Sequence, residues 1–283
     1  METTKMKHVT DTFGERIRKM TGRREKNYIL LHATAVVLSG FSLYGVNPLA
    51  IAFFAAMALA GYANSATIIL MGCSMAYTSS YMDAVKGIAI LVCIYGIYRM
   101  LHHINNTVSK QSMIFISMAS AFAVSTVDLY MELWSQGLFQ AGAGCVLAVS
   151  SGLLVYATSQ AIDTMCNFRP PLKAEQNIAL AILAGGVSYA LLTSFHVQEW
   201  MVLAVGYALV VTILYKYGMT LGCVIGGAFG VVISYVHRDI RIMGGLFVAY
   251  LLAGLAREIG RWSVMAAMSA ALLITGIVQF RIF

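Results

Sequence analysis

Eleven apolar stretches separated by short polar segments cover almost the whole chain after residue 26. They lack the alternation of apolar and polar residues that membrane barrel strands have, and in lipid only helices and closed barrels satisfy every backbone group. The pattern therefore predicts an all-α fold, a polytopic transmembrane helical bundle of about 10–11 spans. The predicted spans are residues 28–44, 47–61, 64–80, 84–101, 112–130, 136–160, 177–194, 199–215, 218–236, 242–256 and 262–279.

Several predicted spans are shorter than the roughly 20 residues that cross the hydrocarbon core. The second and the tenth are the shortest, so we expect one or two spans to be re-entrant or strongly mismatched. Composition agrees with lipid as the main solvent. Of 283 residues, 59% are hydrophobic and 11% are charged, against about 25% charged in a soluble domain. A soluble protein of this length could not bury so much apolar surface.

The first 26 residues form a basic arm. Basic residues before a first span place that end in the cytoplasm and attract anionic lipid. We therefore expect the net charge of +7 to set the topology, and no nucleic acid to bind. Phe13, Ile17 and Met20 recur at helical spacing and predict a short amphipathic helix in the arm. The eight basic residues are Lys5, Lys7, Arg16, Arg18, Lys19, Arg23, Arg24 and Lys26.

Two regions follow from this pattern, a cytoplasmic arm over residues 1–26 and a transmembrane helical domain over residues 27–283. The loop over residues 161–176, stiffened by Pro170 and Pro171, divides the domain into two halves of similar size. With the N-terminus inside, most basic turns fall on the cytoplasmic side of the cell membrane. The cluster from His237 to Arg241 breaks this rule, and an odd number of spans leaves the C-terminus outside.

Glycines at four-residue spacing stand out in the ninth predicted span. Gly222, Gly226 and Gly230 share one helical face. Small residues at this spacing let two helix backbones approach closely in lipid. Helix packing inside the fold is one interpretation of this face. Self-association of two copies through it is the other.

The sequence offers no catalytic, cofactor-binding or metal site. His32 lies one turn into the first span and is interpreted as an interfacial side chain. The five cysteines occur singly and are interpreted as buried, inert thiols. Beyond the arm, every carboxylate lies at a span end or in a loop, whereas coupled transporters keep such groups near the midplane. These are Asp83, Asp128, Glu132, Asp163, Glu175, Glu199, Asp239 and Glu258.

Three segments of the chain carry distinctive motifs. The first reads AGLAREIGR and ends before an apolar helix, with Gly254, Arg257, Glu258, Gly260 and Arg261 as its informative residues. The second, NPLAIAFFAA, is led by Pro48 and ends in the paired aromatics Phe53 and Phe54. The third, PLKAEQ at residues 171–176, runs into ALAIL at residues 179–183.

Together these segments resemble the membrane region of the stage II sporulation protein E family of endospore-forming bacteria. The family pattern for the first segment is AGLFRE(L/I)G(R/K), and here Ala256 replaces its aromatic residue. The compact charged cluster at residues 257–261 is interpreted either as a turn that marks the cytoplasmic surface or as a docking surface for a cytoplasmic partner.

The resemblance implies a membrane anchor that localises and assembles a C-terminal serine phosphatase similar to the protein phosphatase 2C class. In the family that phosphatase needs manganese or magnesium, and it acts on an anti-sigma-factor antagonist to free the forespore sigma factor. The resemblance also implies self-association and contact with the division ring at the asymmetric sporulation septum. No residue here inherits a catalytic role, and whether the protein is an enzyme stays open. We expect the reading frame to continue into a soluble region with metal-binding aspartates.

Two other functional classes stay open at this stage. One is a small-solute permease, against which the absence of mid-span carboxylates counts. The other is a structural integral membrane protein without enzymatic activity.

Overall fold

The computed structural model describes residues 25–41, 47–105, 107–131 and 137–281. The arm up to residue 24, with its expected amphipathic helix, lies outside these ranges. The described residues form eleven α-helices, one 3-10 turn and no strand, so the predicted all-α fold is confirmed. After a first helix over residues 25–39 come α2 Pro48–Leu59, α3 Ser65–Thr78, α4 Tyr81–Asn105, α5 Lys110–Met131, α6 Gly137–Cys166, α7 Ala174–Thr193, α8 Glu199–Tyr217, α9 Met219–His237, α10 Ile240–Leu255, η1 Ala256–Glu258 and α11 Arg261–Arg281.

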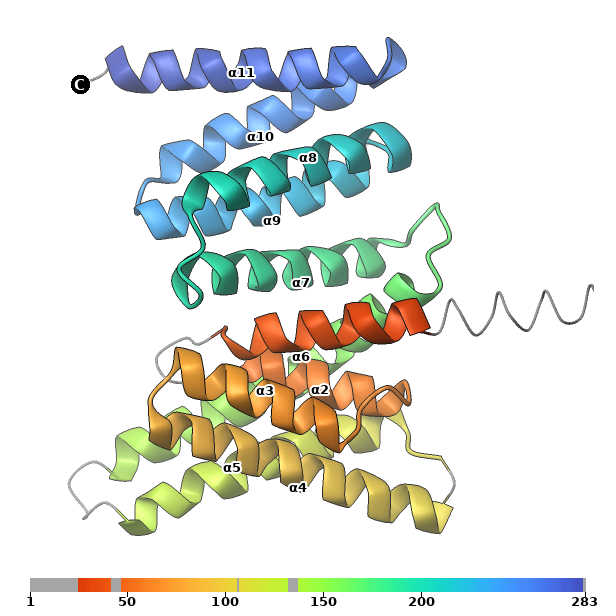
Figure 1. Ribbon diagram of the computed structural model, residues 1–283, viewed down its shortest axis with the longest axis vertical. Coiled ribbons are helices and arrows are strands. Elements are labelled where there is room, and N and C mark those ends of the chain that lie inside the picture. Colours follow the sequence, from red (N-terminus) through yellow and green to blue (C-terminus); the bar gives the residue numbers. More distant parts are fainter. Residues whose placement is uncertain (1–24, 42–46, 106, 132–136, 282–283) are drawn as a thin grey trace, which may run out of the picture.

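The helices lie side by side and are stacked along the longest axis, from α4 and α5 at one end to α11 at the other (Figure 1). Successive helices run in opposite directions, so their ends gather at two edges of the molecule. The start of the first helix lies at the same edge as the α4–α5, α6–α7, α8–α9 and α10–α11 connections. This is the arrangement that repeated crossing of a bilayer requires.

Basic residues are concentrated at that edge, which we call the basic edge. The α9–α10 turn at the opposite edge carries both signs, with Arg238 and Arg241 beside Asp239. A surplus of Lys and Arg at one membrane face marks it as cytoplasmic in most helical membrane proteins. The basic edge carries Lys26, Arg99, Lys110, Arg169, Lys173, Lys216, Arg257 and Arg261.

The helices differ in their ability to span a bilayer. Five helical segments are long and apolar enough to cross a membrane, which supports an integral membrane protein: Tyr81–Asn105, Gly144–Cys166, Ala174–Thr193, Met219–His237 and Ile240–Glu258. The helix α2 has 12 residues and is about 18 Å long at 1.5 Å per residue. The helix α3 has 14 residues, fewer than the sequence pattern predicts. These two short helices follow each other, and α10 with 16 residues is also short.

The predicted loop at residues 161–176 is too long. The helix α6 continues to Cys166 and α7 begins at Ala174, so only residues 167–173 connect them. The polar residues Gln160 and Asp163 suggest an early helix end, but Ala161 and Ile162 lie fully inside the bundle. Asp163 faces outward, where its carboxylate pairs with Lys110 of α5 at 3.3 Å. An amphipathic last turn therefore extends the helix beyond the purely apolar stretch.

The two largest of the three apolar clusters among the described residues lie on either side of α7, whose place in the stack is seen in Figure 1. The first is built on α2 and includes Ala179 and Leu183 of α7. The second joins α8, α9, α10 and α11, and Leu180 and Ala184 of α7 pack against it. A helix presents residues three and four apart on one face and intermediate residues on another. The helix α7 thus joins the two halves, and the connection before it does not separate them.

Candidate functional site

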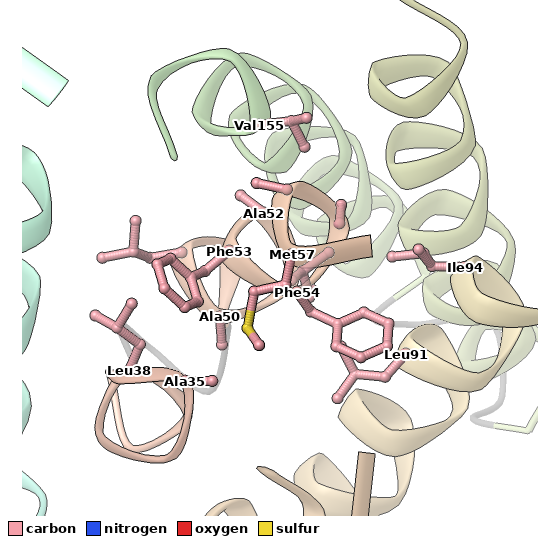
Figure 2. Close-up of a cluster of buried hydrophobic side chains, with 14 of the residues drawn as sticks. Ala35, Leu38, Ala50, Ala52, Phe53, Phe54, Met57, Leu91, Ile94 and Val155 are labelled. Carbon is pink, nitrogen blue, oxygen red and sulfur yellow. The ribbon is translucent and has the colours of Figure 1, made fainter. Parts of the chain in front are cut away.

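The helix α2 carries the second resembling segment and forms the centre of the first core. Pro48 stands at its first turn, where a proline costs no intrahelical hydrogen bond. Phe53 and Phe54 are both fully buried. Neighbouring positions on a helix point about 100° apart, and in Figure 2 Phe53 lies toward Leu38 of the first helix whereas Phe54 lies beside Leu91 of α4. The segment therefore acts as a packing centre between helices.

Polar contacts also hold α2 in place. The hydroxyl of Thr158 in α6 donates to the carbonyl oxygen of Ala52 at 3.1 Å. The amide nitrogen of Asn47, just before the helix, donates to the carbonyl oxygen of Ser39 at 2.9 Å. The first bond ties the backbone of α2 to α6, and the second ties the side chain just before α2 to the end of the first helix. Surrounded in this way, α2 does not need to reach across the bilayer on its own.

The three glycines of α9 contact two neighbouring helices. A Cβ atom on Gly226 would lie 2.7 Å from the Tyr250 ring of α10, closer than real Cβ contacts come. A Cβ atom on Gly230 would meet Leu246 of α10 at 3.5 Å, an ordinary contact, and one on Gly222 would lie 3.0 Å from the Cα atom of Leu214 in α8. The closeness of the helix contact therefore varies along this face, and Gly226 makes the tightest contact with α10.

This glycine face is buried within one chain. Gly222, Gly226 and Gly230 are all buried, and α8 and α10 cover them. These contacts are those that the interpretation of the glycine face as helix packing within one chain predicts. Self-association of the protein stays a prediction, and this face offers no free surface for it in the described structure.

The AGLAREIGR segment lies against the α8–α9 turn at the basic edge. Gly218 alone separates α8 from α9 and has a φ of 104°, a value that favours glycine. Nε of Arg257 donates to the carbonyl oxygen of Tyr215 in the last turn of α8 at 3.0 Å. A cation at a helix C-terminus also interacts favourably with the helix dipole. Arg257 thus caps α8 from the α10–α11 connection, 42 residues later in the chain.

Gly254 and Gly260 give this connection its shape. A Cβ atom on Gly254 would lie 2.7 Å from Cγ of Met219, so the small residue lets α10 approach the first turn of α9. Gly260 has a φ of 140°, which redirects the chain into α11. The hydroxyl of Ser263 then donates to the carbonyl oxygen of Gly260 at 3.0 Å.

The other half of the segment faces outward. Glu258 and Arg261 are exposed, Ile259 is 81% exposed and Trp262 is 70% exposed. The Arg261 guanidinium lies 5.6 Å from the centre of the Trp262 ring. Trp and Arg side chains are typical of the boundary between lipid and water. Arg257 therefore makes a structural contact with α8, whereas most of residues 258–262 are exposed, and both interpretations of the charged cluster stay predictions.

A polar network that the sequence analysis missed joins the first helix to α3. His32 is only 8% exposed and is therefore not an interfacial side chain as predicted. Its Nε2 lies 2.8 Å from the Thr67 hydroxyl and its Nδ1 lies 2.8 Å from the carbonyl oxygen of Tyr28, so Nδ1 carries a proton. Asn64 caps α3 and donates to the Tyr28 hydroxyl at 2.6 Å. The polar pair of Asn64 and Thr67 within an apolar stretch was the available signal.

The prediction of buried cysteines is wrong for three of the five. Cys73, Cys93 and Cys145 are exposed on helix surfaces, and Cys166 and Cys223 are partly exposed. In a membrane protein such a surface faces lipid, so an apolar environment does not require burial within the protein. Among the described residues no three His, Cys, Asp or Glu side chains gather to hold a metal ion.

Comparison with known families agrees with the motif resemblance. The family model described as SpoIIE, N-terminal domain matches residues 1–280. Comparisons with curated proteins and with solved structures give no match. A match over almost the whole chain does not depend on any single motif. The chain therefore belongs to the SpoIIE N-terminal domain family.

Proposed function

We propose that this chain is the membrane anchor and assembly domain of a sporulation-specific serine phosphatase of the protein phosphatase 2C type. Its role is to hold the phosphatase at the asymmetric septum, where forespore sigma factor activation and septation are coupled. The family match over residues 1–280 carries this proposal. The partners would be the division-ring protein, the anti-sigma-factor antagonist and a second copy of the chain. Manganese or magnesium would be needed only in the phosphatase domain.

The interior of the bundle supports an anchor more than a permease. Both cores are lined by apolar side chains, and the described carboxylates lie near helix ends, as Asp83, Asp163, Glu175, Asp239 and Glu258 do. A coupled transporter needs ionisable groups or a broken helix near the midplane. The exposed surface at residues 258–262 offers a place where cytoplasmic parts of the same protein can dock.

The orientation belongs to the same proposal, with the basic edge in the cytoplasm. In a cysteine-free background, single cysteines at Thr3 and Asn167 should resist impermeant thiol reagents in intact cells. A cysteine at Ile240, which is exposed in the α9–α10 turn, should react under the same conditions. Labelling at Asn167 without permeabilisation would show that the orientation is reversed.

Localisation tests the anchoring role directly. The chain, fused through its N-terminus to a fluorescent protein and expressed in sporulating cells, should concentrate at the asymmetric septum. The fusion is placed at the N-terminus because the arm is the proposed cytoplasmic end. Uniform fluorescence along the cell membrane would reject septal anchoring by this domain and favour a structural role. Uptake of a solute that depends on the chain would favour the permease.

A further inference from the structure

The helix α3 lies at the outer surface of the bundle and is shorter than a bilayer is thick. Its 14 residues give a length of about 21 Å, against about 30 Å for the hydrocarbon core. The equally short α2 is enclosed by other helices, whereas α3 exposes Ile69, Leu70 and Cys73. An exposed helix of this length has to be accommodated by thinner lipid, by snorkelling side chains or by contact with another protein.

Polar contacts mark both ends of α3. At the basic edge the Asn64 side chain accepts from the Thr67 amide at 2.9 Å and donates to the Tyr28 hydroxyl at 2.6 Å. At the opposite edge the Ser80 hydroxyl donates to the Asp83 carboxylate at 2.6 Å in the α3–α4 turn. Placing such groups in hydrocarbon is costly. Polar side chains thus limit the apolar length of α3 at both edges.

The charges of α4 indicate the same thickness independently. A Cβ atom on Gly72 of α3 would lie 2.9 Å from Ile88 of α4, so the two antiparallel helices are in close contact. In α4 no charged residue lies between Lys86 and Arg99, which are 13 positions or about 20 Å apart along the helix axis. Cys93, halfway between them, is exposed. Two neighbouring helices therefore agree on a thin apolar surface.

Snorkelling of the charged side chains does not remove this shortfall. A helical side chain points toward the N-terminus of its helix, which for Arg99 is toward the middle of the membrane. The Arg99 guanidinium lies 5.6 Å from the centre of the Tyr95 ring, one turn closer to that middle. The Lys86 side chain can reach outward, but even Asp83 and Arg99 are only about 24 Å apart along the axis.

We propose that the α3–α4 face thins the adjoining bilayer and is covered by phospholipids with short acyl chains. Lys86 and Arg99 set the level of the lipid headgroups there. The far end of the stack differs, since α11 has 21 residues, about 31 Å, and matches a bilayer of ordinary thickness (Figure 1). The proposal rests on the membrane-integral fold and not on the anchoring role. The exposed residues of the α3–α4 face are Ile69, Leu70, Cys73, Val92 and Cys93.

The test measures which lipid touches this face, because bromine on an acyl chain quenches a tryptophan in contact with it. The whole chain, with its three tryptophans replaced by phenylalanine, carries one reporter at a time, Cys73→Trp on α3 or Cys93→Trp on α4. The vesicles contain equal amounts of dimyristoleoyl and dioleoyl phosphatidylcholine, one of them brominated in each sample. We expect the shorter lipid to quench both reporters about threefold more strongly, because each ångström of mismatch carries a penalty.

Leu273→Trp is the matched control, because Leu273 is 66% exposed near the middle of α11. The two lipids should quench it equally. Equal quenching of the reporters on α3 and α4, or the same preference for the shorter lipid at Leu273→Trp, would overturn the proposal. Quenching of those two reporters by neither lipid would also overturn it, since protein and not lipid would then cover the face.

A change in α4 tests whether its charges set the thickness. Lys86→Leu combined with Arg99→Leu extends the apolar stretch from Asp83 to His102, about 28 Å along the axis. The preference for the shorter lipid at Cys93→Trp should then fall from about threefold to nearly equal quenching, because the mismatch on α4 is removed. An unchanged preference in this double variant would show that Lys86 and Arg99 do not set the headgroup level, and the proposal would be wrong.

Discussion

Gly226→Leu should lower the free energy of unfolding by about 3 kcal/mol or more. Even the first carbon of a side chain at Gly226 would lie 2.7 Å from two atoms of the Tyr250 ring. Tyr250 is among the largest fully buried side chains and is only 1% exposed, so its ring has no free space to enter. The helices α9 and α10 would have to separate. In lipid that separation removes the close packing that holds the helices together.

Gly227→Leu is the matched control, because it makes the same substitution one residue later in the same helix. A Cβ atom on Gly227 would meet nothing within 4 Å. Both variants gain about 1 kcal/mol of helix propensity by losing a glycine, so Gly227→Leu should be neutral or slightly stabilising. Thermal unfolding of the two purified variants in one detergent measures the difference. Equal midpoints for Gly226→Leu and the unmodified protein would show that the face is not a close contact.

The sequence pattern predicted each helix because lipid requires it. Every apolar stretch in a bilayer must satisfy its own backbone groups, so each of the eleven stretches coincides with a helix. Helix ends were less predictable. Asp163 at the end of α6 faces solvent while Ala161 and Ile162 are buried, and a change of polarity then marks a face of the helix and not its end.

Burial was the property that hydrophobicity could not predict. A soluble helix reveals its buried face through amphipathicity, but α2 and α3 are both apolar, and α2 is enclosed while Ile69 and Leu70 of α3 are exposed. The exposed Cys73 and the buried His32 were misassigned for the same reason. Lipid and protein interior are similar environments for an apolar side chain.

The candidate site was also predictable only in part. Spacing alone placed Gly222, Gly226 and Gly230 on one helical face, but it could not show which helices cover them. The role of Arg257 was also not predictable, because its acceptor on Tyr215 lies 42 residues away.

Phe54→Ala should lower the free energy of unfolding by about 2 kcal/mol. Truncating a buried phenylalanine costs about 3–5 kcal/mol in soluble proteins, where transfer from water and an unfilled cavity both contribute. In a membrane the unfolded reference is already apolar, so most of the transfer contribution is lost and the cavity contribution remains. Phe54 is fully buried in α2, and its ring meets Tyr95 edge to face with centroids 6.4 Å apart.

Phe115→Ala separates these two contributions, because Phe115 of α5 is 73% exposed on the bundle surface. Its ring already contacts lipid, which fills the space that the ring leaves, so this variant should unfold as the unmodified protein does. Thermal unfolding of both variants in the same lipid provides the comparison. If Phe115→Ala destabilised the protein as much as Phe54→Ala, that outer surface would be covered by another helix. The self-association proposed for this domain would then have a measured location on α5.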